Sequence, residues 1–197
     1  LRKIRSAMVR AGRERLSGTV EVDEVFLGGV KPGKRGRGAA GKVLIIVAVE
    51  DKGKAGFGRI RINIISDARS ETLIHAIKEM VEPGSTIRTD ELSSYPPITK
   101  HEYQHIAIDR ESAVGEDPTP LVHRIAALLK RWLLGTHQGG VQQAHVASYL
   151  DEFVFRFNRR TSRSRGKLFY RLVQNMVVVP DQSGAGVKCL AQKEKAA

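Results

Sequence analysis

The sequence has very little cysteine and no long apolar run. Its 197 residues include one cysteine, which excludes an internal disulfide framework and a cysteine-based zinc site. No stretch approaches the roughly 20 apolar residues that a membrane-spanning helix requires, and no signal-peptide pattern is visible. With 41% hydrophobic residues, the composition predicts a soluble, globular, cytoplasmic protein without a membrane partner.

Acidic residues are absent between Arg156 and Arg171, although basic residues are frequent there. The stretch contains seven Lys or Arg, namely Arg156, Arg159, Arg160, Arg163, Arg165, Lys167 and Arg171. The whole chain carries a formal net charge of +12 at pH 7. Positive charge of this size attracts polyanions, of which nucleic acid is the commonest. The stretch therefore predicts contact with nucleic acid, with a solvated basic surface as the alternative.

Two aspartates stand at strand-like positions. Asp23 lies inside the run of residues 18–27, and Asp90 ends a second run at 85–90. A carboxylate within an apolar strand is costly to bury, and a bound cation is a common compensation. Two such carboxylates in a strongly basic chain predict a metal site that acts on phosphate.

The order of the predicted elements indicates an α/β fold. It is three strands, a helix, a strand, a helical region, a short strand and two helices, which matches an RNase H-like mixed sheet flanked by helices. In that fold the first and fourth strands are neighbours, so we expect Asp23 and Asp90 to lie together. The ranges are strands at 19–26, 43–49, 59–64, 85–90 and 103–108, and helices at 66–81, 118–134 (ended by Gly135) and 142–159.

The helix predicted at 118–134 offers a third ligand. His123 and Lys130 are seven positions apart, which places them on almost the same helix face. His123 would complete the metal site and Lys130 would contact a DNA phosphate, while an ordinary, partly buried histidine is the alternative. Carboxylates that bridge two divalent ions about 3.5–4 Å apart support phosphoryl transfer, so we expect two Mg²⁺ or Mn²⁺ ions.

Other residues compete for these roles. Glu152 is a rival third carboxylate, seven positions before Arg159, but pairing with Arg156 one turn further along the helix is the simpler interpretation. Glu24 points to the opposite sheet face from Asp23, and Glu91 is interpreted as a turn residue.

Two loops are also candidate DNA contacts. The Gly-rich basic loop at 31–41 lacks the spacing of a phosphate-binding P-loop, so we interpret it as a hairpin tip that contacts DNA or is simply solvated. His137 lies in a Gly-Thr-His-Gln-Gly sequence; it contacts DNA or holds that loop.

Several motifs resemble the catalytic domain of ISXO/Merlin-type insertion-sequence transposases. They are Val20-Glu21-Val22-Asp23-Glu24 with Gly28-Gly29, Thr89-Asp90 with Tyr95, residues 129–137 and residues 149–160. The resemblance covers roughly residues 18–172. It implies an RNase H-like fold and metal-dependent cutting and joining of DNA at the ends of a mobile element, by a homo-oligomer on DNA at the nucleoid.

The usual triad of that family is Asp, Asp and Glu, with a Lys seven residues after the Glu. Aligned on Lys130, the Glu position holds His123, which leaves either a His variant of the triad or a decayed enzyme. Imidazole is an acceptable Mn²⁺ ligand and a poor Mg²⁺ ligand. The expected DNA contacts are Lys130, Arg131, Arg156, Arg159, Arg160, Arg163 and Arg165.

Three segments are expected. Residues 1–17 would end an upstream segment, 18–172 would form the catalytic domain, and 173–197 would be an extension that is disordered after about 180. Because the family usually carries an upstream DNA-recognition region and the chain starts at Leu1, we expect a piece of a longer protein. The expected function is transposition, and the alternatives are a decayed DNA-binding remnant or a nuclease of the same fold.

Overall fold

The computed structural model describes residues 2–9, 14–28, 42–90, 96–108, 117–137 and 143–178. The basic loop at 31–41, Glu91, Tyr95 and the tail after 180 lie outside these ranges, as does the side chain of His137. Predictions for those residues stay predictions.

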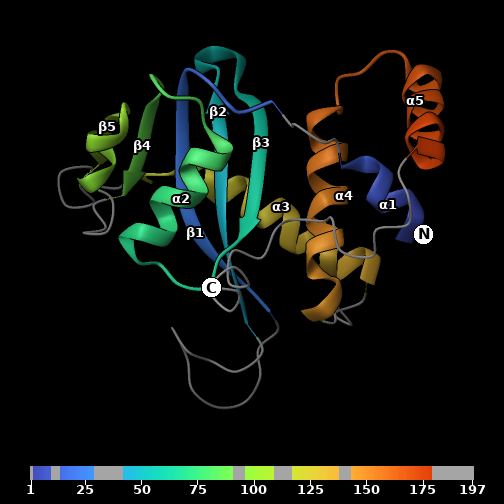
Figure 1. Cartoon of the computed structure of the whole chain (residues 1–197), viewed down its shortest axis with the longest axis horizontal. Coiled ribbons are helices and arrows are strands. Elements are labelled where there is room, and N and C mark those ends of the chain that lie inside the picture. The colour runs from blue at the N-terminus through green and yellow to red at the C-terminus, as the bar shows by residue number, and fades with distance from the viewer. Residues whose placement is uncertain are drawn as a thin grey trace.

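A mixed five-stranded sheet forms the centre of the molecule, in the order β3-β2-β1-β4-β5 (Figure 1). The strand β1 pairs antiparallel with β2 and parallel with β4. The first and fourth strands are therefore neighbours, as the sequence predicts. The strands are β1 Thr19–Leu27, β2 Val43–Asp51, β3 Phe57–Ile64, β4 Thr86–Asp90 and β5 Gln104–Ile108.

Helices cover both faces of the sheet. One buried cluster joins α2 to one face, and a second joins α3 and α4 to the other, while α1 and α5 lie beside α4 (Figure 1). The helices are α1 Arg2–Met8, α2 Ser70–Met80, α3 Pro120–His137, α4 Val146–Asn158 and α5 Arg165–Val178, with 3₁₀ turns η1 Gly53–Ala55, η2 Pro96–His101 and η3 Gln143–His145. In the described part of the chain, none of the helices has the length and apolarity to span a bilayer.

The alternation of β1 fixes the direction in which its acidic side chains point. Val20 and Val22 pack in the α2 cluster, whereas Val25 packs in the α3–α4 cluster. Burying one such side chain contributes about 1.5–3 kcal/mol, and a register shift of one residue would reverse every side chain. The odd positions Glu21 and Asp23 therefore face α3.

The N-terminal residues belong to the same folded body as the sheet. Arg5 of α1 forms an ion pair with Glu152 of α4 at 2.7 Å, and Leu16 is 1% exposed and bridges to Val81. The segment predicted as the end of an upstream region thus packs on the core. At the other end, α5 continues across the boundary predicted at residue 172.

Two helix predictions were wrong. The α3 helix does not stop at Gly135 but continues to His137, because an interior Gly costs only about 1 kcal/mol and the buried Leu129 and Leu133 hold the helix on the sheet. The sequence interpretation also missed α5, since its apolar residues do not all face the core. Four of them are exposed, namely Phe169, Tyr170, Val173 and Val177.

Candidate active site

The register of the sheet aligns Asp23 with Asp90. Parallel pairing of β1 and β4 sets Thr19 opposite Thr86 and Glu21 opposite Arg88. The pairing ends there, and the same offset carried two residues further would set Asp23 opposite Asp90, on the sheet face that α3 covers. Adjacent strands lie roughly 4.8 Å apart, so two carboxylates that are distant in sequence become neighbours.

Asp23 is a buried carboxylate, 7% exposed. Its Oδ1 accepts a hydrogen bond from the Glu24 backbone N–H at 2.7 Å, and its Oδ2 accepts one from Thr119 Oγ1 at 2.9 Å. Burial raises the pKa of Asp23, and the charge of Asp90 raises it further, although the Thr119 hydrogen bond acts in the opposite direction. The carboxylate form is disfavoured here, and a bound cation would offset that cost.

His123 lies between two aspartates at the start of α3. Its Nε2 is 3.3 Å from Asp23 Oδ2, and its Nδ1 is 2.6 Å from Asp117 Oδ2. The side chain is 47% exposed, so it is accessible and not part of the core. The structure thus brings His123 to Asp23, as the metal-ligand prediction requires.

Asp117 holds the histidine, and sequence reasoning missed it. Its Oδ1 accepts the Thr119 backbone N–H at 3.0 Å while its Oδ2 accepts the His123 Nδ1–H. A hydrogen-bonded Nδ1–H leaves Nε2 as the ring atom that turns to Asp23. The signal in the sequence was an Asp just before the Thr119-Pro120 helix start, a place where side-chain caps occur.

Glu21 anchors the first turn of α3 to β1, and it was also missed. The side chain is fully buried, at 0% exposed, and its Oε1 accepts the Val122 backbone N–H at 2.7 Å. Its Oε2 is buried without a hydrogen-bond partner. Burial raises the pKa of Glu21, although the Val122 N–H favours the charged form. Its position, two residues before Asp23 on the same strand face, was the available signal.

Lys130 and Arg131 are exposed on α3. Seven residues advance a helix by roughly 10 Å and almost two full turns, so Lys130 lies on the same side of α3 as His123. Contact between Lys130 and a phosphate beside the site remains a prediction that this geometry allows.

The rival carboxylates are oriented away from Asp23 and Asp90. Glu152 pairs with Arg156 at 3.2 Å, as the alternative interpretation predicts, and also with Arg5. Glu24 occupies the even-numbered face of β1, which packs towards α2.

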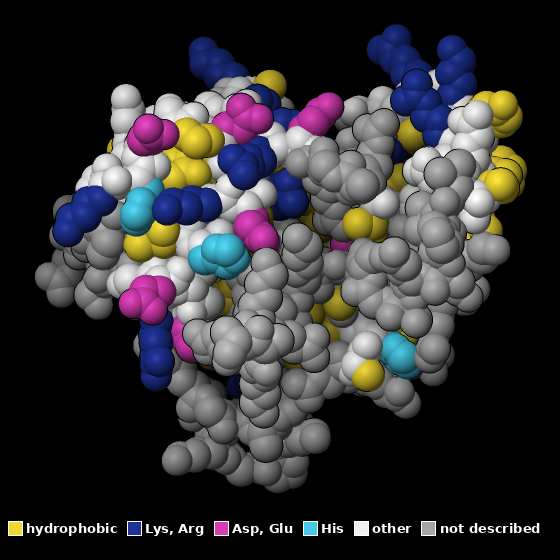
Figure 2. Space-filling model, viewed as in Figure 1, with side chains coloured by type: hydrophobic (Ala, Val, Ile, Leu, Met, Phe, Trp, Pro, Cys, Tyr) yellow, Lys and Arg dark blue, Asp and Glu magenta, His cyan; other side chains and the backbone are white. Residues whose placement is uncertain are grey.

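The predicted DNA-contacting arginines differ in their surroundings. Arg156, Arg163 and Arg165 are exposed, and Lys and Arg side chains gather over the turn between α4 and α5 (Figure 2). Arg160 instead donates hydrogen bonds to the carbonyl oxygens of Phe57, Gly58 and Phe157. Its guanidinium therefore connects α4 to β3.

The donor chemistry fits a divalent ion, although the described residues contain no preformed group of three His, Cys, Asp or Glu side chains around one metal position. Ligands on adjacent sites of an octahedral ion at about 2.1 Å are roughly 3 Å apart. The 3.3 Å between His123 Nε2 and Asp23 Oδ2 is close to that spacing. Asp90, at the end of the neighbouring strand β4, offers a further carboxylate oxygen of the type that such an ion prefers.

Two solved structures that this chain resembles are an integrase catalytic core and an intasome. The catalytic core of BIV integrase has a TM-score of 0.48 at 14% identity, covering 83% of this chain and 99% of that one. A simian T-cell lymphotropic virus intasome, solved in complex with PP2A regulatory subunit B56 gamma, has a TM-score of 0.50 at 16% identity, covering 77% of this chain and 52% of that one. The likeness to the intasome, together with the strand order β3-β2-β1-β4-β5, confirms the RNase H-like fold.

Sequence comparison identifies the family. An uncharacterized transposase-like protein of Haemophilus influenzae is 26% identical over 117 residues, which are 58% of this chain and 94% of that protein. The ISXO2-like transposase domain matches residues 15–158, which include Asp23, Asp90, His123 and Lys130. This chain therefore belongs to the ISXO2-like transposase domain family.

Proposed function

We propose that this chain is the catalytic domain of an insertion-sequence transposase that cuts DNA at element ends and joins them to a target. The observation that carries the proposal is the position of His123 Nε2, 3.3 Å from Asp23 Oδ2, beside a strand register that aligns Asp23 with Asp90. A protein with this substrate acts in the cytoplasm, at the nucleoid.

Asp23, Asp90 and His123 would hold two divalent ions, Mg²⁺ or Mn²⁺. When bound, such ions activate the attacking oxygen and stabilise the leaving oxygen of a phosphodiester. Asp23 and Asp90 orient the site because they extend from paired strands with little freedom to move. The imidazole of His123 favours Mn²⁺ over Mg²⁺.

Asp117 acts in this proposal as a positioning residue. Metal-binding histidines commonly donate their second ring N–H to a carboxylate, which fixes the ring orientation and raises the basicity of the ligand nitrogen. The 2.6 Å contact between Asp117 Oδ2 and His123 Nδ1 has that form. A histidine without such a partner would be more mobile, since the His123 side chain is half exposed.

Basic residues would bind the DNA backbone around this site. Lys130 would contact a phosphate near the cut, and the exposed Arg131, Arg156, Arg163 and Arg165 would add non-specific affinity. We expect the protein to act as a multimer that holds two element ends and a target together.

The test is cleavage and strand transfer on a pre-nicked DNA end, in Mg²⁺ and then in Mn²⁺. The wild type should give joined product, more in Mn²⁺, and Asp90→Asn should give none. Asp67→Asn is a matched control, because Asp67 is a half-buried aspartate that accepts hydrogen bonds from backbone and side-chain groups around the start of α2.

Two outcomes would contradict the proposal. If the protein binds DNA but gives no product in either metal, and Asp23→Asn leaves that binding unchanged, a DNA-binding remnant would be favoured. This alternative arises because His123 stands where the family usually has Glu. Cleaved DNA without joined product would favour a nuclease of the same fold.

A further inference from the structure

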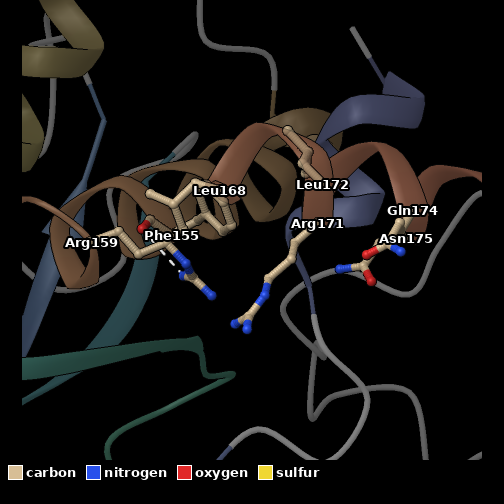
Figure 3. A pocket seen from close by; sticks show the side chains of 7 residues that line it. All are labelled: Phe155, Arg159, Leu168, Arg171, Leu172, Gln174 and Asn175. Carbon is tan, nitrogen blue, oxygen red and sulfur yellow. Dashed lines mark hydrogen bonds between the residues drawn. The ribbon is translucent and has the colours of Figure 1, made fainter. Parts of the chain in front are cut away.

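A pocket of about 260 Å³ lies between α4 and α5, apart from the candidate active site. Its lining residues are Phe155, Arg159, Leu168, Arg171, Leu172, Gln174 and Asn175. Figure 3 shows the guanidinium groups of Arg159 and Arg171 pointing into the same space, one from the end of α4 and one from α5. The volume is several times the roughly 30 Å³ of a water molecule in the liquid, so the pocket admits a phosphate group with part of its sugar.

The pocket concentrates positive charge without a carboxylate of its own. Among the described residues no Asp or Glu lines it, and the sequence has none from residue 153 to residue 180. Glu152, the preceding acid, is already paired with Arg5 and Arg156. Two guanidinium groups directed into one space repel each other unless an anion lies between them.

Arg159 is held ready for such an anion. Its guanidinium carbon lies 4.0 Å from the centre of the Phe155 ring, and its Nη1 donates a 3.4 Å hydrogen bond to the Phe155 carbonyl oxygen. Stacking on an aromatic face fixes the plane of the guanidinium, a geometry suited to bidentate contact with phosphate oxygens. Preorganisation of this kind lowers the entropy cost of binding.

Arg171 supplies the second cation. Within the described residues it forms no hydrogen bond or ion pair, and its side chain is exposed. This contrasts with Arg59 and Arg88, which pair with Glu50 and Asp51. Among the described residues, Arg171 thus makes no polar contact that joins two elements, whereas other arginines do.

The helix α1 braces the two walls of the pocket. Asn175 Nδ2 of α5 donates to the Ala7 carbonyl oxygen at 3.2 Å, and Arg5 of α1 lies 4.6 Å from the centre of the Tyr149 ring on α4. Both helices are therefore fixed to a third, and the spacing of the two arginines depends on packed elements.

We propose that this pocket binds a backbone phosphate of DNA, gripped by Arg159 and Arg171. The inference rests on the proposed function in taking DNA as the polyanion. Figure 1 shows α4 and α5 on the β3 side of the molecule, whereas β4, which carries Asp90, lies on the other side of β1. The pocket is thus a second anchor for DNA, at a distance from the phosphodiester that is cut.

The test is duplex binding by fluorescence anisotropy across a KCl series in EDTA, which removes any contribution of the metal site. Arg171→Ala should weaken binding about tenfold or more and reduce the slope of log K against log[salt] by roughly 0.9, the value for one phosphate. The double variant Arg159→Ala/Arg171→Ala should lose more. The control Arg163→Ala/Lys167→Ala removes two exposed charges outside the pocket and should cost less affinity than that double variant.

If the double variant unfolds, Arg171→Ala alone keeps the test valid, because within the described residues Arg171 has no hydrogen bond or ion pair to lose. Equal losses in the pocket and control variants would overturn the proposal, because the effect would then be general charge. A second result would also overturn the proposal: inorganic phosphate shifts the Arg171 NMR signal, but Arg171→Ala binds DNA with the same affinity as the wild type. The pocket would then be a site for free anions and not for DNA. Strand transfer measured separately distinguishes failure of this anchor from failure of the proposed function.

Discussion

Asp117 accepts a hydrogen bond from His123 Nδ1–H at 2.6 Å, and the opposite side of the same ring faces Asp23. Both aspartates therefore contact one imidazole from opposite sides. This relationship explains how a histidine can occupy a position that the family resemblance assigns to glutamate. Because the ring is fixed at Nδ1, its Nε2 faces the metal position and can serve as the ligand atom that a glutamate oxygen would otherwise supply.

Asp117→Asn should weaken Mn²⁺ binding about 10-fold to 100-fold, the usual cost of losing such a partner. The amide keeps the shape of the side chain but removes the charge that polarises the ring. Calorimetric titration with Mn²⁺ measures the change. Asp67→Asn alters a comparable helix-start aspartate, and an equal loss in both variants would show that Asp117 has only a capping role.

Asp23→Asn should abolish strand transfer and stabilise the metal-free protein. Burial and the Asp90 charge raise the pKa of Asp23, so its charged form destabilises the fold at neutral pH. The gain should appear as a higher free energy of unfolding, measured by urea unfolding in EDTA. Mn²⁺ should raise the melting temperature of the wild type and not of the variant.

The control for this stability effect is Asp51→Asn, which breaks the ion pair with Arg88 and should not stabilise the protein. A metal-free Asp23→Asn protein less stable than the wild type would contradict a metal-dependent role for this carboxylate.

Glu21 should make the stability of the metal-free protein depend on pH. The pKa of Glu21 in the folded state is raised above 4.5. Its contribution to the free energy of unfolding is therefore complete below pH 4.5 and is lost as the pH rises through the folded-state pKa. The pKa of Glu50 is lowered from 4.5 and that of Asp67 from 3.8, so these two carboxylates act in the opposite direction: their contribution to stability is lost as the pH falls below those values. Glu21→Gln should therefore flatten the fall in stability above pH 4.5, measured by urea unfolding from pH 4.5 to 8. An unchanged slope would refute this assignment.

His123→Glu should lose activity in both metals. The new carboxylate would lie next to Asp117, whose Oδ2 is now 2.6 Å from the imidazole, and two adjacent carboxylates repel each other. Strand transfer in Mg²⁺ and Mn²⁺ measures the effect. A strong gain would instead indicate that the site has decayed from a glutamate-containing ancestor.

The sequence was sufficient where a pattern follows directly from backbone geometry. Strand alternation and element order predict that Asp23 and Asp90 lie on neighbouring strands, and helical periodicity sets His123 and Lys130 on one face. The sheet order and the contact of His123 with Asp23 agree with both expectations.

The contacts of Asp117 and Glu21 could not be predicted in the same way. They depend on how the first turn of α3 docks on β1, which is decided by side-chain packing between segments about 100 residues apart, as for Glu21 and Val122. The helix α5 was missed for a related reason. Its Phe169 and Val177 are exposed, so its apolar residues do not all mark a face that packs on the core.

Nitrogen coordination of bound Mn²⁺ tests the central claim most directly. Electron spin-echo envelope modulation of the Mn²⁺-loaded protein should show coupling to a directly bound imidazole nitrogen, and His123→Gln should remove it while the other five of the six histidines remain. Mn²⁺ that binds without nitrogen coupling, or with coupling unchanged in His123→Gln, would contradict the assignment of His123 as the third ligand.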